Sequence, residues 1–277
     1  MTCGVCFRQC DISEGAVGFC GARTCAEGNV KALNYGRITA LALDPIEKKP
    51  LRHFFPGTKI LSVGSFGCNL RCPFCQNSEI SWGEEVKLTA AHAEVMTPEE
   101  LVGLALRYRS RGNIGIAFTY NEPLAGYEFV RDAGKLSHEA GLKNVLVSNG
   151  TASLSVLREI SPYIDAMNID LKSFDRDVYK KVLGGDLDMT MAFIEEASKT
   201  SHVEVTCLIV PGMNDDREQM LRMSEWLASI SEDIPLHVSR FHPCFHMTDR
   251  PPTPVDTVYE LADAARGCLK YVYTGNC

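Results

Sequence analysis

The sequence has no long hydrophobic run and no excess of basic residues. Because no apolar stretch approaches the ~20 residues needed to cross a bilayer, we expect no membrane segment. The chain carries 28 lysines and arginines against 35 acidic residues, which gives a formal net charge of −7. No basic stripe is present to neutralise phosphates, so a nucleic-acid partner is not expected. The first residues also lack the charged and apolar regions of a signal peptide, which predicts a cytoplasmic protein.

Cysteine, in contrast, is abundant. The 277 residues include 12 cysteines, which concentrate between residues 3 and 25 and between residues 68 and 75. Small secreted proteins use this many cysteines for disulfides, but a chain of this length without a signal peptide more often uses them for metal binding or catalysis. Hydrophobic residues make up 45% and charged residues 23%, which indicates an ordinary globular protein. We therefore predict an oxygen-sensitive globular protein that binds metal through its cysteines.

One short loop holds three of these cysteines. Cys68, Cys72 and Cys75 form the pattern C-x3-C-x2-C directly after the apolar run 60–63. Soft thiolates at this spacing favour zinc or an iron–sulfur cluster. Three ligands leave one iron of a [4Fe–4S] cubane open, and an open metal position is where chemistry takes place. A structural zinc site or incidental core cysteines are the alternatives.

Residues 1–30 form a separate cysteine-rich segment. The segment is too short and too rich in glycine to bury a hydrophobic core of its own, so we expect bound metal to hold it together. Its best set of four ligands is Cys3, Cys6, Cys10 and Cys20, with Cys25 as a substitute for one of them. Zinc and a second iron–sulfur cluster both fit. Free, buried or redox-sensitive thiols are the alternative.

Residues 31–58 are predicted to link this segment to the main domain. The charged stretch 44–50 lies among prolines at positions 45, 50 and 56, which exclude a long helix. We expect a solvated loop there. The alternative is that its two acids and two lysines line the mouth of a substrate site.

From residue 59 onward, short β-branched runs alternate with helical stretches. The predicted strands cover residues 60–66, 115–120, 144–149, 166–171, 202–210 and 235–241. The predicted helices cover residues 97–111, 126–140, 153–160, 175–199, 214–229 and 254–268. Such alternation implies βαβ units and a parallel sheet, and fewer units than a closed barrel needs imply an open one. We therefore predict an α/β protein with a partial (β/α)6 TIM-like barrel over residues 59–277.

Polar residues gather where the predicted strands end, which is where parallel barrels place their reactive groups. The cysteine loop follows the first strand, Asn121-Glu122 follows the second and Asn149 follows the third. Asp170 and Lys172 come at the end of the fourth strand, and their spacing of two directs both side chains to one face. We expect this pair either to orient a ligand or to form a structural ion pair.

The last two predicted strands also carry polar residues near their ends. The fifth strand runs into a turn that contains Asn214 and Asp215, either of which would cap the next helix. His237 lies on the sixth strand, where a ligand contact and an ordinary hydrogen-bonded core position are both open. No motif assigns a role to Arg240, His242 or His246.

The cysteine loop resembles that of the radical S-adenosylmethionine (SAM) enzymes. Their hallmark is C-x3-C-x-Φ-C with an aromatic residue at Φ, and Phe74 stands at that position. The resemblance implies that Cys68, Cys72 and Cys75 hold a [4Fe–4S] cluster whose open iron binds the amino and carboxylate groups of SAM.

Later motifs extend the resemblance to the SAM site. Glu122-Pro123 matches the end of the family's G-G-E-P sequence, whose backbone and acid meet the methionyl amino group, while Tyr120-Asn121 replace its glycines. The segments around Val210-Pro211-Gly212 and His237 are similar to SAM-contacting segments of glycyl-radical-enzyme activases. The implied cofactor-binding residues are Phe74, Asn121, Glu122, Asn149, Asp170, Lys172 and His237.

The order of motifs from Cys68 to His237 resembles the pyruvate formate-lyase activating enzymes. A closer resemblance, over nearly the whole chain, is to the AmmeMemoRadiSam family, named for its association with Memo-like proteins. It rests on the N-terminal C-x2-C-x3-C, D-P-I-E-K-K-P, G-C-N-x-x-C-x-F-C-Q-N, T-Y-N-E-P and Y-V-Y-T-G-N. Members commonly continue past the last motif into a tail with a C-x2-C pair, so we expect any metal site or lid of that tail to be missing or rebuilt.

The resemblance implies reductive cleavage of SAM to methionine and a 5′-deoxyadenosyl radical that removes hydrogen from a substrate. Flavodoxin or ferredoxin is the implied electron donor. One hypothesis is that the hydrogen comes from a glycine on a partner protein, with a Memo-like protein as a further companion. A second is rearrangement, fragmentation or coupling of a small molecule or peptide. A non-enzymatic iron–sulfur or zinc scaffold protein is the remaining alternative.

Overall fold

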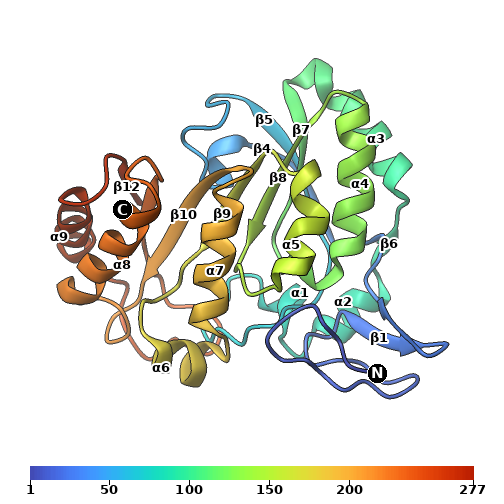
Figure 1. Cartoon of the computed structure of the whole chain (residues 1–277), viewed down its shortest axis with the longest axis horizontal. Coiled ribbons are helices and arrows are strands. Elements are labelled where there is room, and N and C mark those ends of the chain that lie inside the picture. Colours follow the sequence, from blue (N-terminus) through green and yellow to red (C-terminus); the bar gives the residue numbers. More distant parts are fainter.

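The computed structural model describes all 277 residues and is built around one large sheet. Its strands are β4 (Ala40–Pro45), β5 (Lys59–Gly64), β7 (Asn113–Phe118), β8 (Lys143–Ser148), β9 (Ala166–Asp170), β10 (His202–Ile209), β11 (Leu236–Arg240) and β12 (Val272–Gly275). They follow the order β12-β11-β10-β9-β8-β7-β5-β4, and all neighbours are parallel except β4 and β5 (Figure 1). This α/β sheet has the architecture of a partial TIM barrel.

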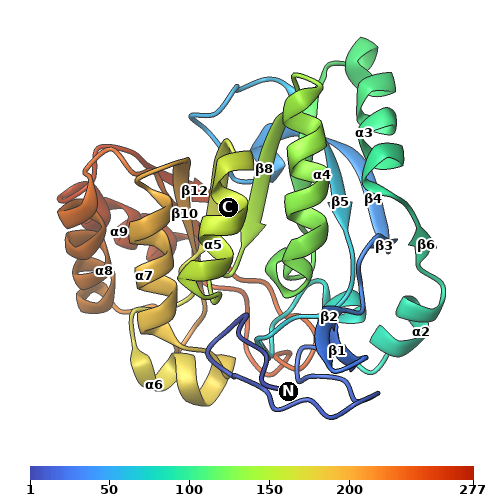
Figure 2. The same ribbon diagram turned by 45° about the vertical axis from the view of Figure 1, so that its right-hand side comes forward.

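Helices connect the strands and cover the outer face of the sheet (Figure 2). The longer ones are α3 (Pro98–Arg107), α4 (Tyr127–Glu139), α5 (Leu154–Ile160), α7 (Leu187–Ala197), α8 (Arg217–Ile230) and α9 (Val255–Arg266). Short helices and turns are η1 (Ile46–Lys48), α1 (Ser78–Ser81), α2 (Val86–Ala91), η2 (Tyr108–Arg111), η3 (Pro123–Gly126), η4 (Ser161–Tyr163), α6 (Arg176–Val178) and η5 (Tyr179–Leu183). No helix combines the length and apolar character that a bilayer-spanning helix needs.

The six predicted strands are confirmed as β5 and β7–β11, with ends shifted by a few residues. Two further strands were missed. β4 is a half-exposed antiparallel edge strand, so its side chains do not form the continuous apolar run of a buried parallel strand. β12 spans only Val272–Gly275, too short for a periodic signal.

The predicted helix 175–199 is wrong as a single element. Residues 176–183 form one short α-helical and one π-helical turn, and a separate helix, α7, starts at Leu187. Gly184 has φ +60°, which ends the first segment, and a Cβ on Gly185 would lie 2.6 Å from the Leu70 side chain. Asp186 then caps α7 by accepting a hydrogen bond from the Met189 N–H.

The predicted solvated loop at residues 44–50 is also wrong. Ile46, Leu51 and Phe54 pack against a small buried cluster from the strands, made of Ile60, Ala117, Val145 and Ala166. We call residues 46–58 the plug segment, because these side chains fill the end of the partial barrel where the strands start. In Figure 2 the plug segment lies at the end of the sheet opposite the N-terminal segment. The position does not support a role at the mouth of the cysteine site.

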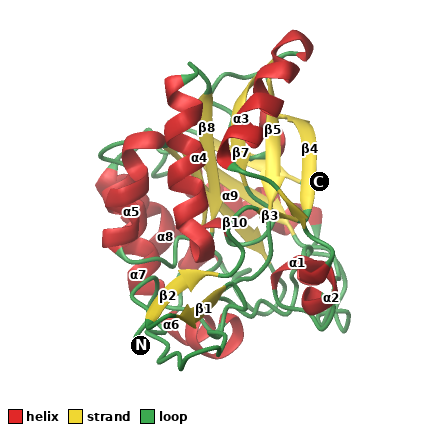
Figure 3. Ribbon diagram, turned by 90° about the vertical axis from the view of Figure 1, so that its right-hand side faces the viewer, coloured by secondary structure: helices red, strands yellow, loops and turns green.

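The N-terminal segment packs across the other end of the sheet, where the parallel strands finish (Figure 3). It contains the hairpin of β1 (Arg23–Ala26) and β2 (Asn29–Ala32), and the pair β3 (Arg37–Ile38) and β6 (Glu94–Val95) follows beside it. Two backbone hydrogen bonds attach the segment to the main domain, from the Cys68 N–H to Cys20 and from the Ser153 N–H to Val5. The segment therefore lies directly against the cysteine loop.

Candidate functional site

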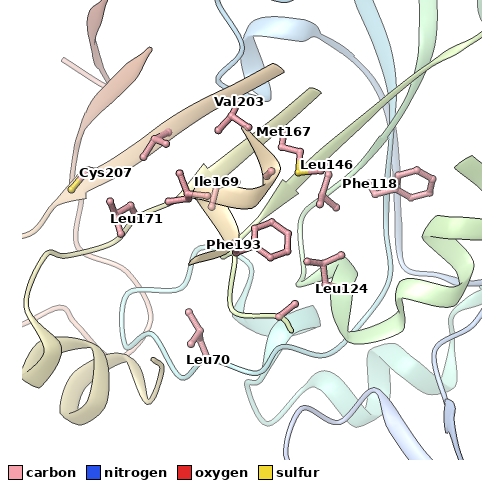
Figure 4. Packing of buried hydrophobic residues seen from close by; sticks show 14 of the residues in the cluster. Leu70, Phe118, Leu124, Leu146, Met167, Ile169, Leu171, Phe193, Val203 and Cys207 are labelled. Carbon is pink, nitrogen blue, oxygen red and sulfur yellow. The ribbon is translucent and has the colours of Figure 1, made fainter. Parts of the chain in front are cut away.

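The cysteine loop follows β5 and is anchored on several sides. Gly67 has φ +93°, and a Cβ there would lie 2.6 Å from Ala22 of the N-terminal segment, so only glycine fits. Leu70 points into the main core with Ile169 and Phe193 (Figure 4). Phe74, at the aromatic position of the motif, is buried against Phe241 with the two rings edge to face at 6.4 Å. The loop is therefore rigidly seated.

The three thiols of the loop are free and largely buried. Burial raises the pKa of each thiol, and the neighbouring cysteines raise it further. Two N–H groups point at the Cys68 sulfur, that of Leu70 at 3.4 Å and the side-chain amide of Asn149 at 3.7 Å. Buried thiols of this kind need a cationic centre to become thiolates.

The donor set fits a cluster better than a single ion. No group of three or more histidine, cysteine or acidic side chains lies close enough together to hold one metal ion. A cubane binds each thiolate through a different iron, so its ligands lie farther apart than those of one zinc ion. Three soft thiols on one buried loop therefore fit a [4Fe–4S] cluster, and the arrangement argues against zinc.

Glu122 lies beside this loop, but its carboxylate already has partners. It accepts hydrogen bonds from the Ser148 hydroxyl at 2.9 Å and from the backbone N–H groups of Leu124 and Asn149 at 2.9 and 2.8 Å. Burial nevertheless raises the pKa of the Glu122 carboxyl. In this structure Glu122 joins the ends of two strands, and its predicted contact with SAM stays a prediction.

We expect Glu122→Gln to lower the free energy of unfolding by about 2 kcal/mol, because a buried amide donor would replace an oxygen that accepts N–H or O–H groups. Iron retention should fall with it. Denaturant unfolding and iron analysis measure both effects. Glu139→Gln, at the exposed end of α4, is the control and should be neutral. Unchanged unfolding combined with weaker SAM binding would instead indicate a direct cofactor contact.

Tyr120 and Asn121 stand where the family motif has glycines. Tyr120 adopts φ +74°, a conformation that favours glycine, and its hydroxyl donates to Asp44 at 2.7 Å. Asn121 accepts from the Ser65 N–H and donates to the Gly67 carbonyl. The backbone thus keeps the shape that glycine would give, while the Asn121 side chain supports the cysteine loop.

Asn149, Asp170 and Lys172 also lie beside the loop. Asn149 donates to Asn69 at 2.9 Å, in addition to its contact with Cys68. Lys172 and Asp170 form the predicted same-face ion pair at 2.9 Å. Burial alone would lower the pKa of the Lys172 ammonium, but the charges of Asp170 and Cys72 outweigh it and raise the pKa. Lys172 is therefore a permanent cation close to Cys72.

His237 is engaged elsewhere. Its Nε2 lies 2.6 Å from the carboxylate of Glu204, which also accepts the N–H groups of Arg52 and His53 in the plug segment. Burial would raise the pKa of Glu204, but His202, His237 and these N–H donors lower it to about 2. No hydrogen bond joins His237 to the cysteine loop. The geometry is that of a hydrogen-bonded core histidine, and contact with SAM stays a prediction.

Sequence reasoning missed several residues around the loop. The Cys244 thiol donates to the Cys75 carbonyl at 3.7 Å, and the His246 N–H donates to the Pro73 carbonyl at 2.9 Å. Asn69 donates to the carbonyl of Thr151 at 2.7 Å. None of these residues belongs to a periodic pattern, so only the doubled asparagine motif and the late cysteine hinted at them.

The helix cap after β10 was assigned to the wrong residue. Asp216 caps α8 by accepting from the Gln219 N–H, whereas Asn214 spans the preceding turn and donates to the Lys172 carbonyl. Asn214 thus helps to hold the strand end that carries the ion pair.

The N-terminal cysteines fall into two groups. Cys3, Cys6, Cys10 and Cys20 line one cavity, whereas Cys25 faces Glu14 with 3.5 Å between its sulfur and the carboxylate. The predicted set of four therefore meets at one place, and Cys25 lies outside it.

Comparison with known proteins gives a consistent result. The model of the radical SAM superfamily matches residues 62–224. Uncharacterized protein MJ0808 of Methanocaldococcus jannaschii is 42% identical over 99% of this chain and 80% of its own length. Pyruvate formate-lyase 1-activating enzyme of Escherichia coli is 25% identical over 68% of this chain and 75% of its own length. A solved domain of pyruvate-formate lyase-activating enzyme from Bacteroides vulgatus shares the fold, with TM-score 0.52 and 18% identity over 58% of this chain and 99% of that one.

Proposed function

Because the chain belongs to the radical SAM superfamily, we propose that it cleaves SAM reductively at a [4Fe–4S] cluster and removes hydrogen from a substrate C–H bond. The observation that carries the proposal is the loop of Cys68, Cys72 and Cys75, three buried thiols at the carboxyl edge of a parallel sheet. Membership of the family implies both the cluster and SAM.

Each residue of the loop has a part in this proposal. Cys68, Cys72 and Cys75 are the cluster ligands, and Phe74 fixes the loop by packing on Phe241. When bound and reduced, the cluster and SAM supply a 5′-deoxyadenosyl radical, the species that takes the hydrogen. The N–H groups of Leu70 and Asn149 favour the charged form of Cys68, because hydrogen bonds to a thiolate stabilise it.

Polar residues at the neighbouring strand ends would receive SAM. Lys172 brings a fixed positive charge close to Cys72, which offsets part of the negative charge of the thiolates. Asp170, half-buried beside it, offers an acceptor to the hydroxyl or amino groups of the cofactor. Asn121, Glu122 and Asn149 hold the loop in position, and we assign them positioning roles on their hydrogen bonds.

For the substrate we favour a glycine on a partner protein, as in an activase. The similarity to pyruvate formate-lyase activating enzyme and the motifs of the AmmeMemoRadiSam family support this choice, with a flavodoxin or ferredoxin as electron donor and a Memo-like companion. A small molecule or a peptide is the second candidate, because an open barrel also admits such substrates.

Isotope transfer would test the proposal. The loaded, reduced protein is given SAM and an anaerobic extract of native cells grown on glycine deuterated at its α-carbon. The extract is divided by size into a protein fraction and a small-molecule fraction. We expect 5′-deoxyadenosine to form and to acquire deuterium from the protein fraction.

The other outcomes are equally informative. Deuterium from the small-molecule fraction, or none from glycine-labelled protein, would exclude the activase role and favour the second candidate. If no 5′-deoxyadenosine forms with either fraction although the cubane is present, the proposed enzymatic function is wrong and a scaffold role remains.

A further inference from the structure

A cavity of about 360 Å³ lies between the N-terminal segment and the cysteine loop. Four of its eleven lining residues are Cys3, Cys6, Cys10 and Cys20. None of the four forms a disulfide. Four reducible thiols from one short segment thus surround a single enclosed space.

Two arginines line the same cavity. Arg8 donates to the carbonyls of Asn69 and Gly184, so its guanidinium is held in place near the cysteines. Arg23 is 4% exposed and pairs with Glu128, yet its Nε has no hydrogen-bond partner. A buried donor without a partner is costly, which indicates an acceptor or an anionic group in the cavity.

The size of the cavity distinguishes between the metals that four cysteines bind. Zinc holds thiolates at about 2.3 Å, so a zinc site closes on its ion and leaves no cavity of this size. No three of these side chains are close enough to share one ion. A cubane with four thiolates is larger and carries net negative charge, which matches the volume and the two guanidinium groups.

We propose that Cys3, Cys6, Cys10 and Cys20 hold a second [4Fe–4S] cluster. With four protein ligands it has no open iron, so its role would be electron transfer. The Cys68 N–H donates to the Cys20 carbonyl at 3.0 Å, and Asn69 lines the cavity, so the two sites adjoin. The second cluster would accept one electron from a low-potential carrier and pass it to the first, with no atom or proton transferred. This relay role rests on the proposed function, whereas the presence of the cluster does not.

Metal analysis of the full chain tests the inference. The protein is loaded anaerobically with iron, sulfide and an equal concentration of zinc, and the metals per chain are counted. We expect about eight irons in the wild type and about four in a variant with Cys68, Cys72 and Cys75 all changed to alanine. The cluster left in that variant should show a reduced cubane EPR spectrum that SAM does not alter.

Two variants of the N-terminal segment complete the experiment. Cys6→Ala combined with Cys20→Ala should keep about four irons and an EPR spectrum that SAM does alter. Cys25→Ala is the matched control, since Cys25 belongs to the same segment but does not line the cavity, and it should keep all the iron.

Two results would overturn the second cluster. One is about one zinc and no iron in the variant that lacks the loop cysteines, which would mean a zinc site. The other is no metal at all in that variant. Because its N-terminal segment is intact, the result does not depend on whether the Cys6 and Cys20 variant folds. Eight irons without any SAM cleavage would leave the second cluster in place and reject the proposed function.

Discussion

Replacing Cys72 with alanine is expected to reduce SAM cleavage to background. Cys72 is buried and central in the loop, and without its thiolate one iron of the proposed cubane loses its only protein ligand. Changing an outer partner of a metal ligand costs roughly 10- to 100-fold, so loss of a ligand should cost more. The measurements are 5′-deoxyadenosine formation and the EPR spectrum of the reduced protein, compared at equal protein concentration.

Cys244→Ala is a sharp control for this experiment. The Cys244 thiol lies against the carbonyl of Cys75, so it shares the surroundings of the loop without belonging to the motif. We expect this variant to keep both the SAM-sensitive cubane spectrum and most of the cleavage. If cleavage survives in Cys72→Ala, or disappears in Cys244→Ala, the assignment of ligands is wrong.

The sequence predicts the central part of this fold well, and the reason is physical. Parallel strands buried on both faces need continuous β-branched runs, so β5 and β7–β11 stand out. The start of α3 is equally plain, because Thr97 and Glu100 form a reciprocal capping box. The cysteine loop is visible because its chemistry depends on spacing alone.

The other features depend on tertiary packing. A glutamate in a motif does not reveal whether its carboxylate faces a ligand, and in Glu122 three protein donors occupy it. The same holds for His237, whose partner Glu204 is 33 residues away in the chain. Charge and proline content at residues 44–50 predict exposure, but three apolar side chains nearby bury the segment. Local composition and tertiary burial disagree there, and burial prevails.

The plug segment contains the second large expected effect, in a buried ion pair. Lys49, with 3% of its side chain exposed, lies 2.9 Å from Asp44. Tyr120 donates to the same carboxylate and its ring lies 4.5 Å from the Lys49 ammonium. Burial would raise the pKa of Asp44, but the hydrogen bonds from Tyr120 and Lys49 outweigh it and hold the pKa below its usual range.

We expect Lys49→Met to lower the free energy of unfolding by about 3–5 kcal/mol, because it leaves a buried carboxylate without its main counter-charge. Lys48→Met provides the matched control. Lys48 pairs with the same carboxylate at 3.3 Å, but 68% of its side chain is exposed, so its loss should cost less than about 1 kcal/mol. Anaerobic denaturant unfolding of the loaded protein compares the two variants. Equal losses would mean that the buried position of Lys49 adds nothing.

The same pair predicts a pH dependence with a definite sign. A carboxyl whose folded pKa is depressed contributes stability above its unfolded pKa and loses it as the pH falls toward the folded value. Wild type and Lys48→Met should therefore both lose stability below about pH 4, the region where an unfolded aspartate takes up its proton. Lys49→Met should lose less over this range, because the depression of the Asp44 pKa depends on the lysine that it lacks. Parallel losses in all three proteins would place the acid sensitivity outside this ion pair.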